Sequence, residues 1–222
     1  MKARLAALAA GLILAATAAH SQVVINEGFD DITSLTASGW ILSNASTPAG
    51  STGWFQGDQT IFTSQAGAPE AYIGANYNNA APGGTIANWL ISPKFSTEDK
   101  GSVSFYARAD LIAGADFADT LKFGFSSGGS SFADFALGAA QTIAGAWTHY
   151  TVNFAPQGAG TVGRFAIEYA GLADTSNYVG IDTFTVAVPE PETWALFVVG
   201  LGGLGVVLRR RKARRWSIGR RT

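Results

Sequence analysis

The sequence of 222 residues predicts an all-β fold, a two-sheet antiparallel β-sandwich (jelly roll), flanked by an N-terminal signal helix and a C-terminal transmembrane helix. Three observations predict it. About nine to eleven short segments carry strand patterns, and turn signals separate them. Gly, Ser, Thr, Asn and Ala dominate residues 22–187, with aromatic residues spaced between them. No amphipathic helical pattern of useful length occurs in the same range.

The first residues have the layout of a secretory signal peptide. Lys2 and Arg4 form a positive start, Leu5–Ala15 is a short apolar core, and small residues follow it. Such a core is too short to span a membrane, so residues 1–21 are predicted to be removed, with cleavage between residues 18 and 21. We therefore expect export by the Sec machinery and processing by signal peptidase. The mature domain is then expected to occupy residues 22–187, the length of one domain.

The predicted domain is acidic, although the whole chain carries a net charge of only −1. Residues 22–188 contain 14 Asp and Glu residues but only five Lys and Arg residues, a net charge of −9. Such a domain does not neutralise phosphates, so the charge excludes nucleic acid as a partner. The chain has no cysteine, so no disulfide stabilises it after export. A domain of this length can bury a sufficient core without one.

In the first half of the domain, runs rich in Val, Ile, Trp and Phe are bounded by turn-forming residues, which favours short strands. The predicted strands are Val23–Phe29, Gly39–Leu42, Trp54–Phe55, Ala71–Ala75 and Asn88–Ser92. Pro93 ends the last of them, because proline cannot donate to a strand ladder. Two polar segments with proline and glycine, Ser46–Gly53 and Asn76–Gly84, are predicted loops.

The second half of the domain shows a clear alternation of apolar and polar residues. The predicted strands are Ser102–Arg108, Thr120–Phe125, Trp147–Phe154, Val162–Tyr169 and Tyr178–Val186. Alternation of period two places one set of side chains on the core face and the other set outside. The side chains expected inside are Val103, Phe105, Ala107, Leu121, Phe123, Phe125, Tyr150, Val152, Phe154, Phe165, Ile167 and Tyr169. Lys122, His149, Arg164 and Glu168 are expected on the outer faces.

Several local motifs resemble the choice-of-anchor J domain. The chain opens with Glu27-Gly28-Phe29-Asp30 followed by Gly39-Trp40, and Asn88–Pro93 reads NWLISP, the most specific of the motifs. Val103–Arg108 and Val179–Asp182 fit the same pattern. This resemblance implies a jelly roll similar to cleaved-adhesin and MAM-like domains. It also implies localisation at the cell surface, since the family occurs with different surface anchors.

The acidic residues suggest a calcium site. In related adhesin-like jelly rolls the first and last strands lie side by side with metal near them, so the resemblance implies that Glu27 and Asp182 meet. Asp30 and Asp58 are further candidate ligands, because calcium binds carboxylate and carbonyl oxygens that converge from loops. The alternative is that Glu27 and Asp182 cap turns or accept backbone hydrogen bonds.

Catalytic chemistry has weak support. His149 is the only histidine after residue 21 and lies on the polar face of a predicted strand, so a solvated side chain is expected. One histidine without cysteine supports neither a Ser-His-Asp site nor a zinc site. Asp116 and Asp119 offer two carboxylates of the kind that glycosidases use, but a solvated loop is the expected interpretation.

The aromatic residues offer a binding face for sugars. Trp89 and Trp147 are expected in the core, where most aromatics of a β domain lie. Trp54 and Tyr77 are flanked by Gly and Asn in predicted loops, so they are the best candidates for a ligand-binding surface.

The C-terminal part has three features in a fixed order. Pro189-Glu190-Pro191 ends the domain, because the prolines interrupt a helix or a strand. Trp194–Leu208 is an uncharged run of 15 residues, about 22 Å as a helix against a hydrocarbon core of about 30 Å. A basic cluster beginning with Arg209, Arg210 and Arg211 follows, which places this end on the cytoplasmic side.

These three features resemble the PEP-CTERM sorting signal of Gram-negative bacteria, here residues 188–215, with residues 216–222 as a cytoplasmic tail. The resemblance implies recognition by an exosortase, a membrane cysteine protease-transpeptidase, often in organisms that make exopolysaccharide. The alternative is an ordinary tail anchor that no enzyme cuts.

The sequence therefore predicts a non-enzymatic surface or extracellular-matrix protein, sorted by an exosortase through an inner-membrane precursor and associated with exopolysaccharide. The alternatives are a carbohydrate-binding or adhesion module with a specific glycan ligand, and a polysaccharide hydrolase.

Overall fold

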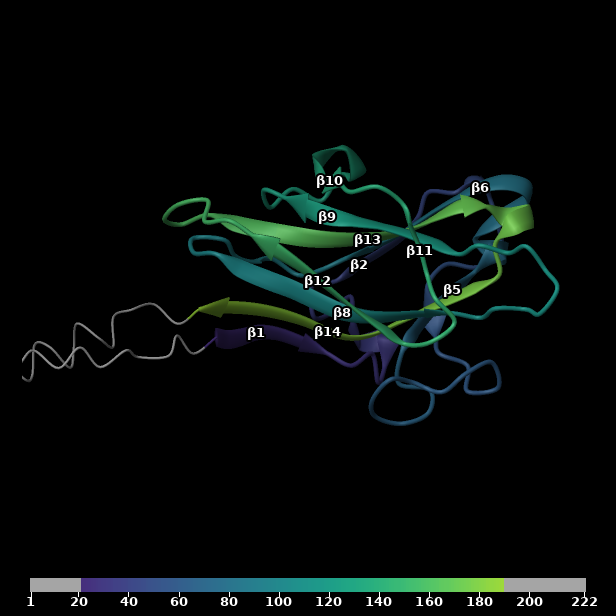
Figure 1. Cartoon of the computed structure of the whole chain (residues 1–222). Coiled ribbons are helices and arrows are strands. Elements are labelled where there is room, and N and C mark those ends of the chain that lie inside the picture. Colours follow the sequence, from purple (N-terminus) through teal and green to yellow (C-terminus); the bar gives the residue numbers. More distant parts are fainter. Residues whose placement is uncertain (1–20, 190–222) are drawn as a thin grey trace, which may run out of the picture. The chain divides into compact units, whose positions relative to one another are not determined.

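Two antiparallel sheets face each other in the computed structural model, which describes residues 21–189 (Figure 1). The predicted all-β, two-sheet sandwich is therefore confirmed. The helices of this part are four 3-10 turns: η1 Ile32–Ser34, η2 Tyr77–Asn79, η3 Phe132–Asp134 and η4 Ala173–Thr175. Within residues 21–189 no helix is long and apolar enough to cross a bilayer. The predicted signal and transmembrane helices lie outside the described residues.

The first sheet has six strands in the order β12-β8-β14-β5-β4, with β1 paired to β14. Their bounds are β12 Thr148–Phe154, β8 Gly101–Ala109, β14 Tyr178–Pro189, β5 Ile73–Asn76, β4 Phe55–Gln56 and β1 Ser21–Glu27. The pairing of β1 with β14 places the first and last strands side by side, as predicted.

The second sheet has eight strands in the order β10-β9-β13-β6-β2, with β11 on β9, β3 on β6 and β7 on β13. Their bounds are β10 Ala136–Leu137, β9 Thr120–Ser126, β13 Val162–Leu172, β6 Ala80–Ile91, β2 Ile41–Asn44, β11 Gln141–Thr142, β3 Thr47–Ala49 and β7 Phe95–Ser96. The long strands β13 and β6 form its centre.

The core lies between the two sheets, and the alternating residues fill it as predicted. Val103 and Phe105 of β8 are fully buried, and Phe165 of β13 lies opposite, its ring centroid 6.1 Å from that of Phe105. Phe184 of β14 packs on Phe165 at 6.0 Å. Each fully buried large apolar side chain contributes about 1.5–3 kcal/mol to folding. A core of this kind explains how the domain folds without disulfides.

Three strands occupy segments that were not predicted to be strands, wholly or in part. β6 begins at Ala80, inside the predicted loop Asn76–Gly84, and β3 lies in the predicted loop Ser46–Gly53. β14 continues to Pro189, beyond the predicted end at Val186. Proline is tolerated at a strand's edge or end, where its missing N–H costs no ladder bond. Pairing with neighbouring strands therefore decides these segments more than side-chain pattern does.

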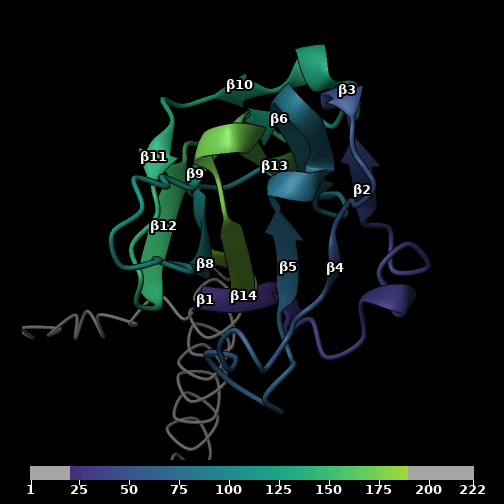
Figure 2. The ribbon, with the colours of Figure 1, turned by 90° about the vertical axis from the view of Figure 1, so that its right-hand side faces the viewer.

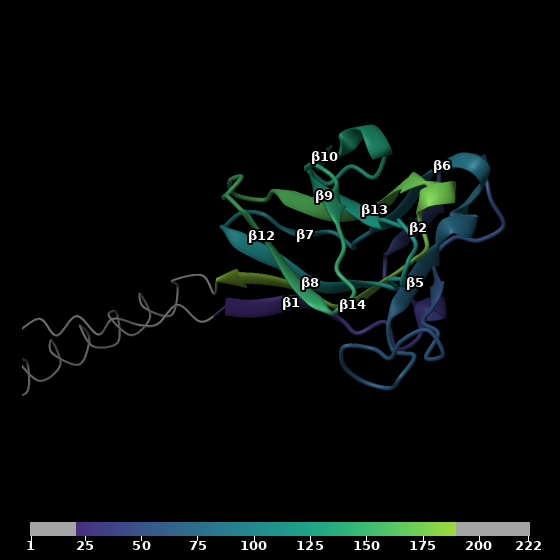
Figure 3. The same ribbon diagram turned by 45° about the vertical axis from the view of Figure 1, so that its right-hand side comes forward.

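The two ends of the sandwich carry different features. Ser21 pairs with Pro189, so the first and last described residues lie together at one end, here called the base. The opposite end, here called the tip, carries η2, η4 and the loop of residues 110–119 that joins β8 to β9 (Figure 3). β14 runs the full length, from Tyr178 at the tip to Pro189 at the base.

Candidate functional site

A pocket of about 460 Å³ opens at the tip. It is lined by Tyr77, Asn78, Ala80, Pro82, Ile112, Phe117, Ala173, Asp174, Ser176 and Asn177. The 3-10 turns η2 and η4 lie side by side above the ends of β5 and β14 (Figure 2). Residues of both turns line the pocket, so they form two of its walls. The loop of residues 110–119 contributes Ile112 and Phe117. We call this hollow the tip pocket.

Hydrogen bonds hold the walls of the tip pocket together. Asn76 accepts the backbone N–H of Asn78 at 3.0 Å, which fixes the start of η2. Asn177 joins two of the walls, because its carbonyl accepts the N–H of Tyr77 at 3.0 Å while its side-chain amide donates to the carbonyl of Asp110 at 2.8 Å. The N–H of Gly83 donates to Asp174 at 2.9 Å. The three chain segments are therefore held in place before any ligand binds.

The surface of the tip pocket combines exposed apolar side chains with polar groups that lack partners. Tyr77 is 46 % exposed, Ile112 48 % and Phe117 36 %. Among the described residues, the Tyr77 hydroxyl and the Asn78 side-chain amide make no hydrogen bond. The hydroxyl of Ser176 is buried and lies near the Tyr169 phenol, but it makes no well-formed hydrogen bond. Tyr77, predicted as a ligand-binding residue, therefore lies in a pocket with free polar groups.

Asp119 lies behind the tip pocket and is not the solvated loop residue that the sequence suggested. It is 1 % exposed, and its carboxylate accepts hydrogen bonds from the Tyr169 hydroxyl and from the N–H groups of Asn177 (2.9 Å) and Tyr178 (3.3 Å). Burial raises the pKa of Asp119, against the lowering effect of these hydrogen bonds. Asp116 is exposed, as predicted. Because Asp119 is enclosed, it supports the fold and does not face a substrate.

Trp54, the second predicted ligand-binding residue, is in the core, so that prediction is wrong. It is 8 % exposed and packs among the buried side chains between the sheets. Trp54 precedes β4, a strand of two residues, which is too short to show an alternation that would reveal the buried face.

The two tryptophans that were expected in the core, Trp89 and Trp147, divide differently from the prediction. Trp89 is buried as predicted, but it lies on the outer face of the eight-stranded sheet, where Phe132 stacks on it at 4.7 Å. Trp147 is half-buried rather than buried. Its ring lies edge-on to Phe62 at 5.5 Å, and its indole N–H donates to the carbonyl of Thr63 at 2.9 Å.

The carboxylates proposed as calcium ligands do not converge. Residues 21–189 contain no group of three or more His, Cys, Asp or Glu side chains that could hold a metal ion. Asp182 is buried and accepts the N–H groups of Gln65 at 2.7 Å and Ala66 at 3.0 Å. Burial raises the pKa of Asp182, against these hydrogen bonds. Asp30 is exposed.

The other two calcium candidates stabilise local turns. Glu27 accepts the N–H of Phe29 at 2.8 Å. Asp58 accepts the N–H and the hydroxyl of Thr60 at 2.8 and 2.6 Å, and these bonds lower the pKa of Asp58. The geometry therefore fits the alternative of hydrogen-bond acceptors, and calcium binding remains an untested hypothesis.

His149 lies on the solvent face of β12, as predicted, beside the ring of Tyr106 at 4.7 Å. Its neighbours on the paired strand β8 include no nucleophile arranged with a base.

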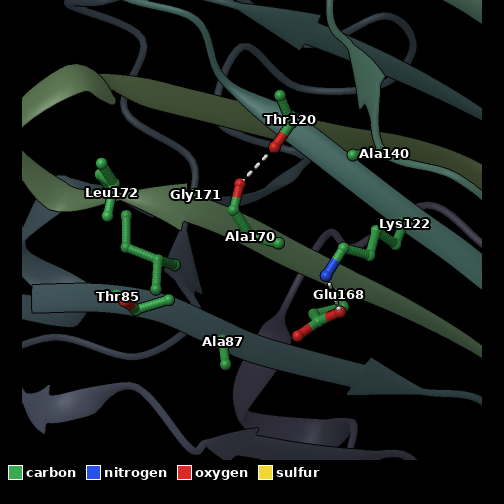
Figure 4. A pocket seen from close by; sticks show the side chains of 10 residues that line it. Thr85, Ala87, Thr120, Lys122, Ala140, Glu168, Ala170, Gly171 and Leu172 are labelled. Carbon is green, nitrogen blue, oxygen red and sulfur yellow. Dashed lines mark hydrogen bonds and ion pairs between the residues drawn. The ribbon is translucent and has the colours of Figure 1, made fainter.

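A second hollow, here called the sheet groove, lies on the outer face of the eight-stranded sheet (Figure 4). Its volume is about 380 Å³, and small residues such as Ala87 and Ala170 leave it open. Lys122 of β9 and Glu168 of β13 face each other across the strands, with Nζ and Oε2 3.3 Å apart. The hydroxyl of Thr120 donates to the carbonyl of Ala170. Lys122, Glu168 and Thr120 therefore have partners in the protein, while the Thr85 hydroxyl makes no hydrogen bond within residues 21–189.

Comparisons with known proteins agree with the fold. The K3 cleaved adhesin domain of Lys-gingipain from Porphyromonas gingivalis W83 has a TM-score of 0.53 and 18 % identity, over 74 % of this chain and 98 % of that one. The K1 domain of the same protein has a TM-score of 0.52 and 19 % identity, over 73 % and 96 %. At such low identity the likeness shows the sandwich fold alone. No curated protein matches the chain by sequence.

A third structure is less similar. The CBM22-1 xylan-binding domain of Xyn10C from Paenibacillus barcinonensis has a TM-score of 0.41 and 12 % identity, over 79 % of this chain and 99 % of that one. This likeness is too low to support an inference about the chain.

The C-terminal prediction has direct support. Residues 187–212 match the PEP-CTERM protein-sorting motif. The match includes the predicted signal residues Pro189, Glu190, Pro191, Arg209, Arg210 and Arg211, most of which lie outside the described residues. The motif implies an exported, membrane-anchored precursor that an exosortase processes.

Proposed function

We propose that this chain is a non-enzymatic protein of the cell surface or extracellular matrix of a Gram-negative bacterium, associated with exopolysaccharide. The Sec machinery exports it, signal peptidase removes residues 1–21, and an exosortase processes the inner-membrane precursor. The observation that carries the proposal is the sorting motif at residues 187–212, which follows the sandwich directly. We also propose that the domain belongs to the choice-of-anchor J family. The best support is the sequence NWLISP, which covers the end of β6 and the two residues after it.

The arrangement of the domain suits an anchored protein. The motif begins where β14 ends at the base, next to the start of β1. The tip pocket lies at the other end of β14, a strand of 12 residues that spans roughly 40 Å at about 3.3 Å per residue. Attachment through the base therefore leaves the tip free to contact material outside the cell.

An adhesion or carbohydrate-binding module is the second candidate, and the tip pocket with its free polar groups favours it. A hydrolase acting through Asp116 and Asp119 has less support, because Asp119 is buried and its oxygens accept hydrogen bonds from the protein.

The mass of the native protein tests the proposal. If the tail is a sorting signal, the protein isolated from the surface or the medium lacks Trp194–Thr222. Replacement of Pro189-Glu190-Pro191 by three alanines should leave the unprocessed chain in the inner membrane. A native protein that retains the whole tail would show an ordinary tail anchor instead.

A further inference from the structure

The chemistry of the tip pocket identifies a class of ligand. Tyr77, Ile112 and Phe117 present apolar surface from two separate segments, so the pocket contacts a ligand from both sides. Exposed aromatic and aliphatic groups of this kind favour a ligand with an apolar face. The volume of about 460 Å³ falls within the roughly 300–1,000 Å³ of small-molecule sites.

The polar groups of the pocket favour a ligand that also forms hydrogen bonds. The Tyr77 hydroxyl and the Asn78 side-chain amide line the pocket and have no hydrogen-bond partner within residues 21–189. The ligand therefore carries both donors and acceptors.

Charge excludes other ligands. None of the residues that line the pocket is Lys or Arg, and Asp174 contributes one carboxylate. The surrounding domain carries a net charge of −9 between residues 22 and 188. An acidic polymer would therefore be repelled, and a single carboxylate does not make a cation site.

We infer that the tip pocket binds a neutral sugar residue of an extracellular polysaccharide, with a ring face against Tyr77 and Phe117 and a hydroxyl at the Asn78 side-chain amide. A pyranose ring has an apolar C–H face and a rim of hydroxyls, which is the combination that the pocket presents. This inference rests on the proposed location of the protein in polysaccharide. It adds that the polymer is neutral and that the tip binds it.

The wall structure explains how such a site keeps its shape. The hydrogen bonds from Asn177 to Asp110 and from Gly83 to Asp174 fix the loop, η4 and β6 in the absence of a ligand. A site that is already ordered loses less conformational entropy on binding than a flexible one. The pocket therefore suits a weak ligand such as a single sugar within a long polymer.

Affinity electrophoresis of the full protein purified from cells tests the inference. The probe is extracellular polysaccharide from the producing culture, separated by anion exchange into neutral and acidic fractions and cast into the gels. The neutral fraction should retard the protein, and the acidic fraction should not. Tyr77→Ala and Phe117→Ala should each raise the apparent dissociation constant about tenfold or more, because each removes a ring that contacts the sugar.

Phe132→Ala is the matched control, since Phe132 is 38 % exposed, close to the 36 % of Phe117, but lies on the sheet face against Trp89. It should leave retardation unchanged. The unfolding curve of each variant is measured in parallel and must match that of the wild type for the binding result to be used. Any variant that unfolds early is replaced by Tyr77→Phe or Asn78→Ala.

Retardation by the acidic fraction alone, no retardation, or equal losses in Phe132→Ala and Phe117→Ala would overturn the inference. A protein that is processed and exported normally but shows no retardation would refute the sugar site and leave the proposed sorting intact. A protein that keeps its tail but binds the neutral fraction through Tyr77 would refute the proposed sorting and leave the sugar site intact.

Discussion

The tip pocket and the sheet groove have similar volumes, about 460 and 380 Å³, but different side chains line them. In the groove, Lys122 and Glu168 form an ion pair, and none of the lining residues is aromatic. In the pocket, the side-chain polar groups of Tyr77 and Asn78 have no partner in the described part of the chain. The two hollows therefore differ in the aromatic rings that line them and in the pairing of their charged groups, and not in size.

The largest expected effect is the difference in the free energy of unfolding between a substitution in the core, at Trp54, and one in the tip pocket, at Tyr77. Trp54→Ala should lower the free energy of unfolding by about 3–5 kcal/mol, since it removes buried apolar area and leaves a cavity. Tyr77→Ala should lower it by less than about 1 kcal/mol, because the side chain is 46 % exposed. Urea unfolding curves measure both, and losses of equal size would show that Tyr77 supports the fold rather than a ligand.

The next largest effect on the free energy of unfolding is expected at Asp119, which lies behind the tip pocket. Asp119→Ala should destabilise the protein by about 3 kcal/mol, because it leaves the Tyr169 hydroxyl and the N–H groups of Asn177 and Tyr178 without their acceptor. Asp116→Ala, at an exposed position of the same loop, should change the unfolding free energy by less than about 0.5 kcal/mol. If both variants were equally stable, Asp119 would not be the support of the pocket wall.

The sheet groove should respond weakly to loss of its ion pair. Lys122 is 39 % exposed at its side chain, so solvent screens its attraction to Glu168. Glu168→Gln should therefore cost less than about 1 kcal/mol in thermal or urea unfolding and leave polysaccharide retardation unchanged. A loss of retardation in this variant would move the binding site from the tip to the groove.

The smallest expected effect concerns calcium. Because Glu27, Asp58 and Asp182 each accept hydrogen bonds from nearby groups and do not converge, millimolar calcium should leave the melting temperature unchanged. Differential scanning calorimetry with calcium and with chelator measures this. A rise in calcium that disappears in Glu27→Gln would establish the carboxylate site that the sequence suggested.

Much of the fold could be predicted because half-buried strands have a period of two. Val103 and Phe105 of β8 and Phe165 and Tyr169 of β13 all face the core as their alternation indicates. The start of β6 at Ala80 could not be predicted, because it pairs through backbone groups in a segment with a loop composition.

The candidate site was predicted only in part, because its residues meet through the topology. Tyr77 was recognised from its polar, glycine-rich surroundings, but Ile112 and Phe117 approach it only after β8 has paired with β14 and β9 with β13. Asp119 is buried by Tyr169, which lies 50 positions further along the chain. Neither of these contacts is visible in a single sequence. The error at Trp54 has another cause, since the two-residue strand β4 that follows it is too short to show an alternation.

Surface labelling of intact cells tests most directly whether the tip faces the outside. The chain has no cysteine, so Ala113→Cys, at an exposed position of the 110–119 loop, introduces one thiol at the tip. A membrane-impermeant maleimide should label this variant on intact cells as completely as in the purified protein. Labelling that appears only after the membranes are broken would contradict an exported protein whose tip is presented to the extracellular matrix.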